Sequence, residues 1–150
     1  EIDIVLSFLD YTLLSQSLAE TTIPLALEND VGVILCSPLG GSLLAGPEPI
    51  IKEELTPDRD RVLPPAAIGG PTDPAVAPYA HQMWQWCKEQ GLNIRDLAMQ
   101  FVLNAPVEGN GIVLAGPANQ KEFDEVYASA TTKVPEIVWQ DFEAAFDVRI

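Results

Sequence analysis

The chain has 150 residues, 47% of them hydrophobic, and its 22 acidic residues against 8 lysines and arginines give a formal net charge of −14. This composition suits one globular domain with a packed core and excludes a largely disordered chain. The charge disfavours nucleic acid and anionic lipid as partners, because binding to either depends on lysine and arginine.

Neither a membrane anchor nor a secretory signal is evident in the sequence. No apolar run reaches the roughly 18 residues that a membrane span requires, and the N-terminus lacks the basic, apolar, small-residue order of a signal peptide. Two cysteines, Cys36 and Cys87, are too few for a disulfide scaffold. We therefore expect two reduced thiols in a cytoplasmic protein.

Three short apolar runs predict β-strands, at Ile2–Leu9, Val31–Cys36 and Gly111–Ala115. Each run is apolar almost throughout, which is typical of strands buried on both faces of a parallel sheet. Five segments with helical features lie between and after them, and they are Leu18–Asn29, Pro78–Gln90, Ile94–Asn104, Gln120–Ala130 and Ile137–Phe146. Strands separated by helices imply right-handed crossovers and an α/β fold.

Local signals set several of these helix boundaries. Pro24 is tolerated in the first segment only if it falls in the first turn of a helix. Asn93 is a suitable N-cap for the third segment, and Pro106 stops it. In the fourth segment, Phe123, Val126 and Tyr127 share one face.

A proline- and glycine-rich segment at residues 38–78 interrupts the regular pattern. It holds 9 of the 13 prolines and 5 of the 10 glycines, so we predict a long loop there. Loops of this length in compact domains are often functional. The alternative is a linker between two domains, but the segments on both sides continue one α/β pattern, so we expect a single domain over 1–150.

Two turns at the ends of predicted strands are candidate ligand sites. Residues 37–41 (Ser-Pro-Leu-Gly-Gly) follow the second strand, and residues 116–119 (Gly-Pro-Ala-Asn) lead into a helix. Ligands of α/β folds bind at the carboxyl ends of strands, and helix N-termini favour anions. Each turn is equally compatible with an ordinary βα connection, since neither a P-loop nor a G-x-G-x-x-G fingerprint is present. His81, the only histidine, lacks a partner at metal-binding spacing, so we expect no metal site.

Taken together, these segments resemble the aldo-keto reductase superfamily over about residues 2–131. The similarity is greatest to its L-galactose, L-fucose and D-arabinose dehydrogenase branch. The matching stretches are DIVLSFLDYTLL (Asp3–Leu14), LALENDVGVILCSPLGGSLLAGPEP (Leu25–Pro49), NIRDLAMQFVLNAP (Asn93–Pro106) and GIVLAGPANQKEFDEV (Gly111–Val126). The family fold is an eight-stranded β/α barrel, so the resemblance implies a partial TIM barrel that contains its last three parallel strands with their helices.

The resemblance also implies a nicotinamide dinucleotide as ligand. Ser37, Pro38, Leu39 and Gly40 match the turn that contacts the cofactor diphosphate, and Gly116, Pro117, Ala118 and Asn119 match the turn around the adenosine ribose. Phe8 and Cys36 stand where many members carry a Gln and a Tyr at the nicotinamide. Glu122 falls where NADP-using members carry Arg, and its carboxylate would repel a 2′-phosphate, which favours NAD over NADP.

The family's catalytic Asp, Tyr, Lys and His lie on strands that this chain does not match, so the resemblance implies no catalytic residue here. Three parallel strands alone also leave sheet edges unpaired. Our first interpretation is the C-terminal cofactor-binding portion of an NAD(P)-dependent sugar or aldehyde oxidoreductase, inactive in isolation, whose edges are covered by a missing N-terminal barrel half or another chain. The alternatives are a truncated pseudoenzyme that acts as a dinucleotide-binding or interaction module, and an unrelated α/β protein.

Overall fold

A parallel three-stranded sheet forms the centre of the computed structural model, which describes residues 2–49 and 76–149. Strand β1 spans Ile4–Phe8, β2 Gly32–Cys36 and β3 Gly111–Leu114. The strands are ordered β1-β2-β3, as in the sequence. Cys36 at the end of β2 lies between Phe8 of β1 and Leu114 of β3. The predicted α/β fold with parallel strands is confirmed, and the three strand ends meet at one edge.

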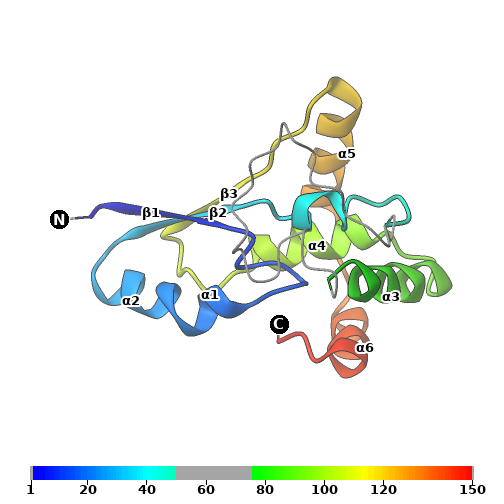
Figure 1. Cartoon of the computed structure of the whole chain (residues 1–150), viewed down its shortest axis with the longest axis horizontal. Helices are drawn as coiled ribbons and strands as arrows, with labels where there is room; N and C mark the ends of the chain where they lie inside the picture. The colour runs from blue at the N-terminus through cyan, green and yellow to red at the C-terminus, as the bar shows by residue number, and fades with distance from the viewer. Residues whose placement is uncertain (1, 50–75, 150) are drawn as a thin grey trace.

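Helices connect these strands and follow the last one (Figure 1). They are α1 (Ser17–Glu20), α2 (Thr22–Glu28), the 3₁₀ turn η1 (Gly40–Ser42), α3 (Val76–Glu89), α4 (Ile94–Leu103), α5 (Gln120–Thr131) and α6 (Glu136–Phe146). Asn93 caps α4 as predicted, because its side chain accepts a hydrogen bond from the Arg95 N–H. None of the helices within the described ranges is long and apolar enough to cross a bilayer.

The first predicted helix, Leu18–Asn29, is wrong as one element, because it is divided at Thr21 into α1 and α2. Pro24 explains the break. A proline lacks the N–H that would bond to Glu20, and its ring clashes with the carbonyl of that residue. The chain therefore starts a second helix at Thr22, which places Pro24 in a first turn, where proline is tolerated.

The predicted loop at residues 38–78 differs from the structure at both ends. Residues 40–42 form the short turn η1, and the chain is already helical at Val76, so Pro78 lies within α3 rather than at its start. Residues 50–75 of that prediction lie outside the described residues.

The hydrophobic core lies on one face of the sheet. Val33 and Leu35 of β2 are each 2% exposed and point into a cluster with side chains from α2, α3, α4 and α6. The Tyr11 ring stacks on Phe101 of α4 with centroids 4.9 Å apart. In Figure 1, α1 and α2 lie below the strands. These helices hold the sheet in place from that side.

Within residues 2–49 and 76–149 no layer covers the opposite face of the sheet, so the expectation of strands buried on both faces is not met in the described part of the chain. Ile4, Leu6 and Phe8 of β1 are 60%, 57% and 40% exposed, and Ile112 and Leu114 of β3 are 61% and 51% exposed. Successive strand side chains point to opposite faces, and in these strands both sets are apolar except for Ser7. The sequence therefore encodes a second layer that the described residues do not supply.

Helix α6 closes the core at the far end from the sheet. Phe142 is fully buried, with its ring centroid 5.3 Å from that of Trp86 and 4.8 Å from that of Phe146. The Tyr79 hydroxyl of α3 donates to the Phe146 carbonyl at 2.8 Å. These contacts attach α6 to α3 and make it part of the domain.

The two cysteines are free thiols in different environments. Cys87 of α3 is 1% exposed, and burial raises its pKa from 9.0 to about 12, while the pKa of the half-buried Cys36 is raised less strongly by burial. We expect iodoacetamide at pH 8 to alkylate Cys36 first and Cys87 only on unfolding, as peptide mass spectrometry will show. Alkylation of Cys87 before Cys36 would contradict this placement.

The raised pKa of Cys87 also gives the stability a pH dependence. Above pH 9 the thiol ionises in the unfolded chain but stays protonated in the folded one, so the free energy of unfolding should fall as the pH rises towards 12. Denaturant titrations of the wild type and of Cys87→Ala measure this, and the alanine variant should lose less stability over that pH range.

Candidate functional site

Two residues with unusual backbone conformation lie at the carboxyl ends of β1 and β2. Leu9 has φ 68° and Ser37 has φ 62°, a left-handed region that residues other than glycine rarely adopt. The Leu9 N–H donates to the Cys36 carbonyl and the Ser37 N–H to the Leu114 carbonyl, both at 3.3 Å. The hydrogen bonding of the sheet therefore continues to the point where the chain turns. Backbone strain of the kind seen at Leu9 and Ser37 is a common feature of ligand sites.

The turn after β2 depends on Gly40. Its φ is +56°, and a Cβ atom there would lie 2.8 Å from a methyl carbon of Leu14. The Gly40 N–H donates to the Ser37 carbonyl at 2.9 Å and closes the turn. Glycine at this position thus lets the chain double back beside β2 and places Leu39 and Ser42 along one side of a groove.

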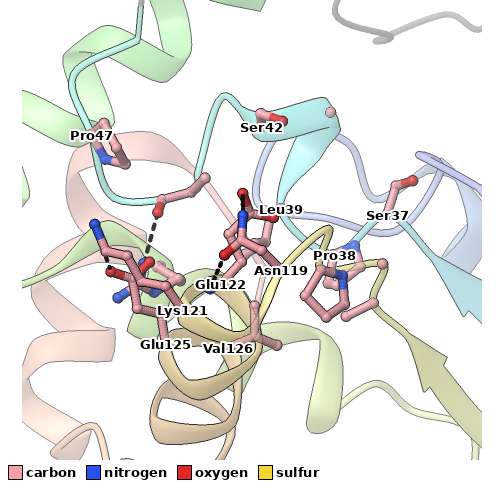
Figure 2. Close-up of a pocket in the computed structure, with 16 residues that line it drawn as sticks. Ser37, Pro38, Leu39, Ser42, Pro47, Asn119, Lys121, Glu122, Glu125 and Val126 are labelled. Carbon is pink, nitrogen blue, oxygen red and sulfur yellow. Dashed lines mark hydrogen bonds and ion pairs between the residues drawn. The ribbon is translucent and has the colours of Figure 1, made fainter.

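The N-terminus of α5 lies on the other side of that groove and is capped by its own side chains (Figure 2). The Asn119 Oδ1 accepts from the Glu122 N–H at 3.0 Å. The Glu122 carboxylate in turn accepts from the Ala118 N–H and from the Asn119 side-chain amide, both at 2.8 Å. This arrangement is a variant of the capping box, because Glu122 accepts from the N–H of the residue before the N-cap, Ala118, instead of from that of Asn119. It places a carboxylate at the position where a helix N-terminus would hold an anion.

The groove between these two turns has a volume of about 630 Å³, within the range of small-molecule sites. Its charged side chains are two cations, Arg95 and Lys121, and two carboxylates, Glu122 and Glu125. Arg95 and Glu125 form an ion pair at 2.9 Å, and Lys121, 83% exposed, lies 3.9 Å from the same carboxylate. Of the two cations among the described lining residues, Lys121 is therefore the one that remains accessible to a ligand at the mouth of the groove.

The structure brings together most of the residues that the sequence singled out. Seven of them line the groove, namely Ser37, Pro38, Leu39, Gly116, Pro117, Asn119 and Glu122. Gly40 is buried beneath the turn, and Ala118 contributes its N–H to the cap rather than a surface to the groove. Phe8 and Cys36 lie elsewhere, on the open face of the sheet, where they are direct cross-strand neighbours.

Several groove residues were missed by sequence reasoning. They include Ser42, Ala45, Pro47, Arg95 and Glu125. Arg95 lies on α4, far in sequence from either turn, and no motif points to it. For Glu125 the signal was present, since it lies one turn after Lys121 and Glu122 on the same helix.

No cluster of histidine, cysteine, aspartate or glutamate suited to a metal ion occurs in residues 2–49 or 76–149. His81 of α3 instead pairs with the Glu48 carboxylate at 3.0 Å near the surface. The groove thus combines two strand-end turns, a capped helix N-terminus and four charged side chains.

Comparison with known proteins agrees with this architecture. No curated protein sequence matches the chain significantly. Among solved structures, glycerol dehydrogenase AKR11B4 from Gluconobacter oxydans is similar, with a TM-score of 0.59 and 16% sequence identity. The match covers 98% of this chain and 44% of that one, so the chain spans less than half of that protein and has the fold of part of its barrel. The family model for aldo/keto reductases matches residues 1–147, and the chain therefore belongs to the aldo/keto reductase family.

Proposed function

We propose that this chain is the C-terminal, dinucleotide-binding portion of an NAD(P)-dependent oxidoreductase. The observation that carries the proposal is the groove itself. Its walls are the Ser37–Leu39 turn and the Gly116–Asn119 turn, which face each other at the carboxyl ends of β2 and β3. In β/α barrels the active site is built from loops at that end of the strands. The diphosphate would lie along the first turn and the adenosine ribose at the second.

NAD suits the groove better than NADP. The Glu122 carboxylate already accepts a hydrogen bond from the Ala118 N–H at the helix N-terminus. A 2′-phosphate there would face the negative charge of Glu122, and the Ala118 N–H would not be free to donate to it. A ribose 2′-hydroxyl can instead donate to that carboxylate, which is how NAD is commonly recognised. The nicotinamide would lie towards Cys36 and Phe8, on the open face of the sheet.

The open face supports a proposal about the rest of the molecule. A barrel needs eight strands, and the structural relative is more than twice as long as this chain. We infer that further strands, from an N-terminal barrel half or another chain, cover Leu6, Ile112 and Leu114 and supply the Asp, Tyr, Lys and His of the family. Without them the chain binds cofactor but does not transfer hydride. Substrates would be sugars or aldehydes, as in the dehydrogenase branch that the sequence resembles, in the cytoplasm.

A second candidate function rests on the same exposed face. A pseudoenzyme that lacks the tetrad would use the apolar sheet face, with Ile4 60% and Ile112 61% exposed, to bind a partner. Exposed apolar patches of this kind mark interaction surfaces in soluble proteins. A second copy of the chain is disfavoured as that partner, because each copy has a net charge of −14.

Titration of the purified full chain with NADH and NADPH, followed by tryptophan quenching, tests the first proposal. We expect saturable binding of NADH and weaker binding of NADPH. NADH should also slow the alkylation of Cys36. If neither cofactor binds at millimolar concentration, dinucleotide binding by this chain is wrong, and a stable complex formed through the sheet face would then support the second candidate.

A further inference from the structure

Residues 45–48, which we call the strap, follow η1 and run along the outer side of the groove. Three side chains of neighbouring helices form hydrogen bonds or an ion pair with three of the four strap residues. The Ala45 carbonyl accepts from Arg95 Nη1 at 3.1 Å, and the Gly46 carbonyl accepts from Trp84 Nε1 at 3.0 Å. Glu48 pairs with His81. The strap is therefore fastened to α3 and α4.

Arg95 differs from the other two because its guanidinium also reaches the opposite wall. Nη1 donates to the Glu125 carboxylate at 2.9 Å, and Nε donates to the Ser129 hydroxyl at 3.1 Å, both on α5. The hydroxyl of Ser129, a residue that is 1% exposed, donates in turn to the Asp96 carboxylate of α4 at 2.6 Å. One nearly buried side chain on α4, 13% exposed, thus bridges the strap and α5.

The fit around this guanidinium is close. Gly46 has φ +107°, and a Cβ atom there would lie 3.2 Å from Asn93 Oδ1 and 3.5 Å from Arg95 Nη1. The strap can approach the guanidinium this closely because glycine occupies that position. In Figure 2, Pro47 of the strap lies across the groove from Lys121 and Glu125 of α5.

We propose that Arg95 is a positioning residue that sets the spacing between the strap and α5, and thereby holds the groove open at the width that the dinucleotide needs. This inference rests on the proposed function. An arginine fork directs N–H donors from separate nitrogens at fixed angles, whereas a lysine carries all its donors on one nitrogen and does not reproduce that spacing. A groove whose strap is already fixed loses less conformational entropy on ligand binding than a groove whose strap must first be ordered.

Arg95→Lys and Arg95→Met in the purified full chain test the proposal, with Arg149→Met as the matched control. Arg149 is 83% exposed and pairs at the surface with Glu20. We expect Arg95→Met to raise the Kd for NADH about tenfold, chiefly through faster dissociation. Relative to Arg95→Met, Arg95→Lys should recover the melting temperature of the wild type but not its affinity for NADH, because lysine returns the positive charge without the bridge. Arg149→Met should change neither.

A readout without ligand separates this inference from the proposed function. In hydrogen exchange, both Arg95 variants should speed the exchange of amides in the strap and the first turn of α5, and leave β2 unchanged. If Arg95→Met does not fold, Glu125→Gln tests the same bridge, and we expect a Kd about threefold higher, since a neutral acceptor replaces a charged one. Absence of NADH binding in the wild type, together with faster strap exchange in the Arg95 variants, overturns the proposed function and leaves only the bridge between the strap and α5. Unchanged exchange in the strap, or full recovery of affinity in Arg95→Lys, overturns the positioning role.

Discussion

Replacing Phe142 with alanine is expected to lower the free energy of unfolding by about 3–5 kcal/mol, the usual result of deleting a fully buried aromatic side chain. Phe142 is 0% exposed, and its ring contacts Trp86 of α3 and Phe146 of α6. Its removal leaves a cavity where α6 meets the core. For a chain of this size we expect the melting temperature to drop by roughly 10 °C. Urea unfolding monitored by circular dichroism measures the change.

Phe123→Ala is the matched control for this prediction. Phe123 is 52% exposed and stacks on Tyr127 at the surface, with centroids 6.3 Å apart. The same chemical change at this exposed site should cost less than about 1 kcal/mol. If the two variants are equally stable, α6 does not belong to the core and the described packing against α3 is wrong.

Replacing Glu122 with arginine is expected to raise the ratio of NADPH to NADH affinity by on the order of 100-fold. The wild-type carboxylate accepts from the Ala118 N–H, and under the proposed function it would repel a 2′-phosphate. Unit charges about 4 Å apart interact by roughly 1 kcal/mol in water and about 4 kcal/mol near a protein surface. Glu122 is solvent-exposed, so we take the lower part of that range. We apply it once for the loss of the negative charge and once for the gain of the positive charge. Parallel fluorescence titrations with the two cofactors give the ratio.

Two further variants separate charge from capping in this experiment. Glu122→Gln keeps an acceptor for the Ala118 N–H but removes the charge, and we expect a change in the ratio of about tenfold. Asp124→Asn on the same helix removes an equal charge from a residue that bonds to Gln120 outside the groove, and it should leave the ratio unchanged. Equal effects of Glu122→Gln and Asp124→Asn would mean that net charge alone governs the preference.

The sequence was sufficient to locate the strands, because apolar β-branched runs bounded by turn residues are a strong local signal. It was not sufficient to show that Leu6 and Ile112 are exposed. A strand that is apolar on both faces indicates that two layers cover it, but not whether both layers come from the same stretch of chain. The break at Thr21 was partly readable, since Pro24 had to fall in the first turn of a helix.

The candidate site was predictable where its residues follow strands directly. Ser37 and Gly116 come at the ends of β2 and β3, and parallel strands place those ends at one edge. The bridge through Arg95 was not predictable, because it joins residues 30 to 50 positions apart by side-chain hydrogen bonds. Such contacts depend on how α4 packs against α5, which local patterns do not encode.

The way α6 packs also has a consequence for biosynthesis. The buried ring of Phe142 and the Phe146 carbonyl that accepts from Tyr79 complete contacts with α3, a helix made more than fifty residues earlier. During translation, Trp86 of α3 therefore lacks its packing partner Phe142 until α6 has left the ribosome exit tunnel. Nascent chains stalled before residue 136 should for that reason be protease-sensitive and bound by chaperones, and the contacts of α3 should become protected only after α6 emerges.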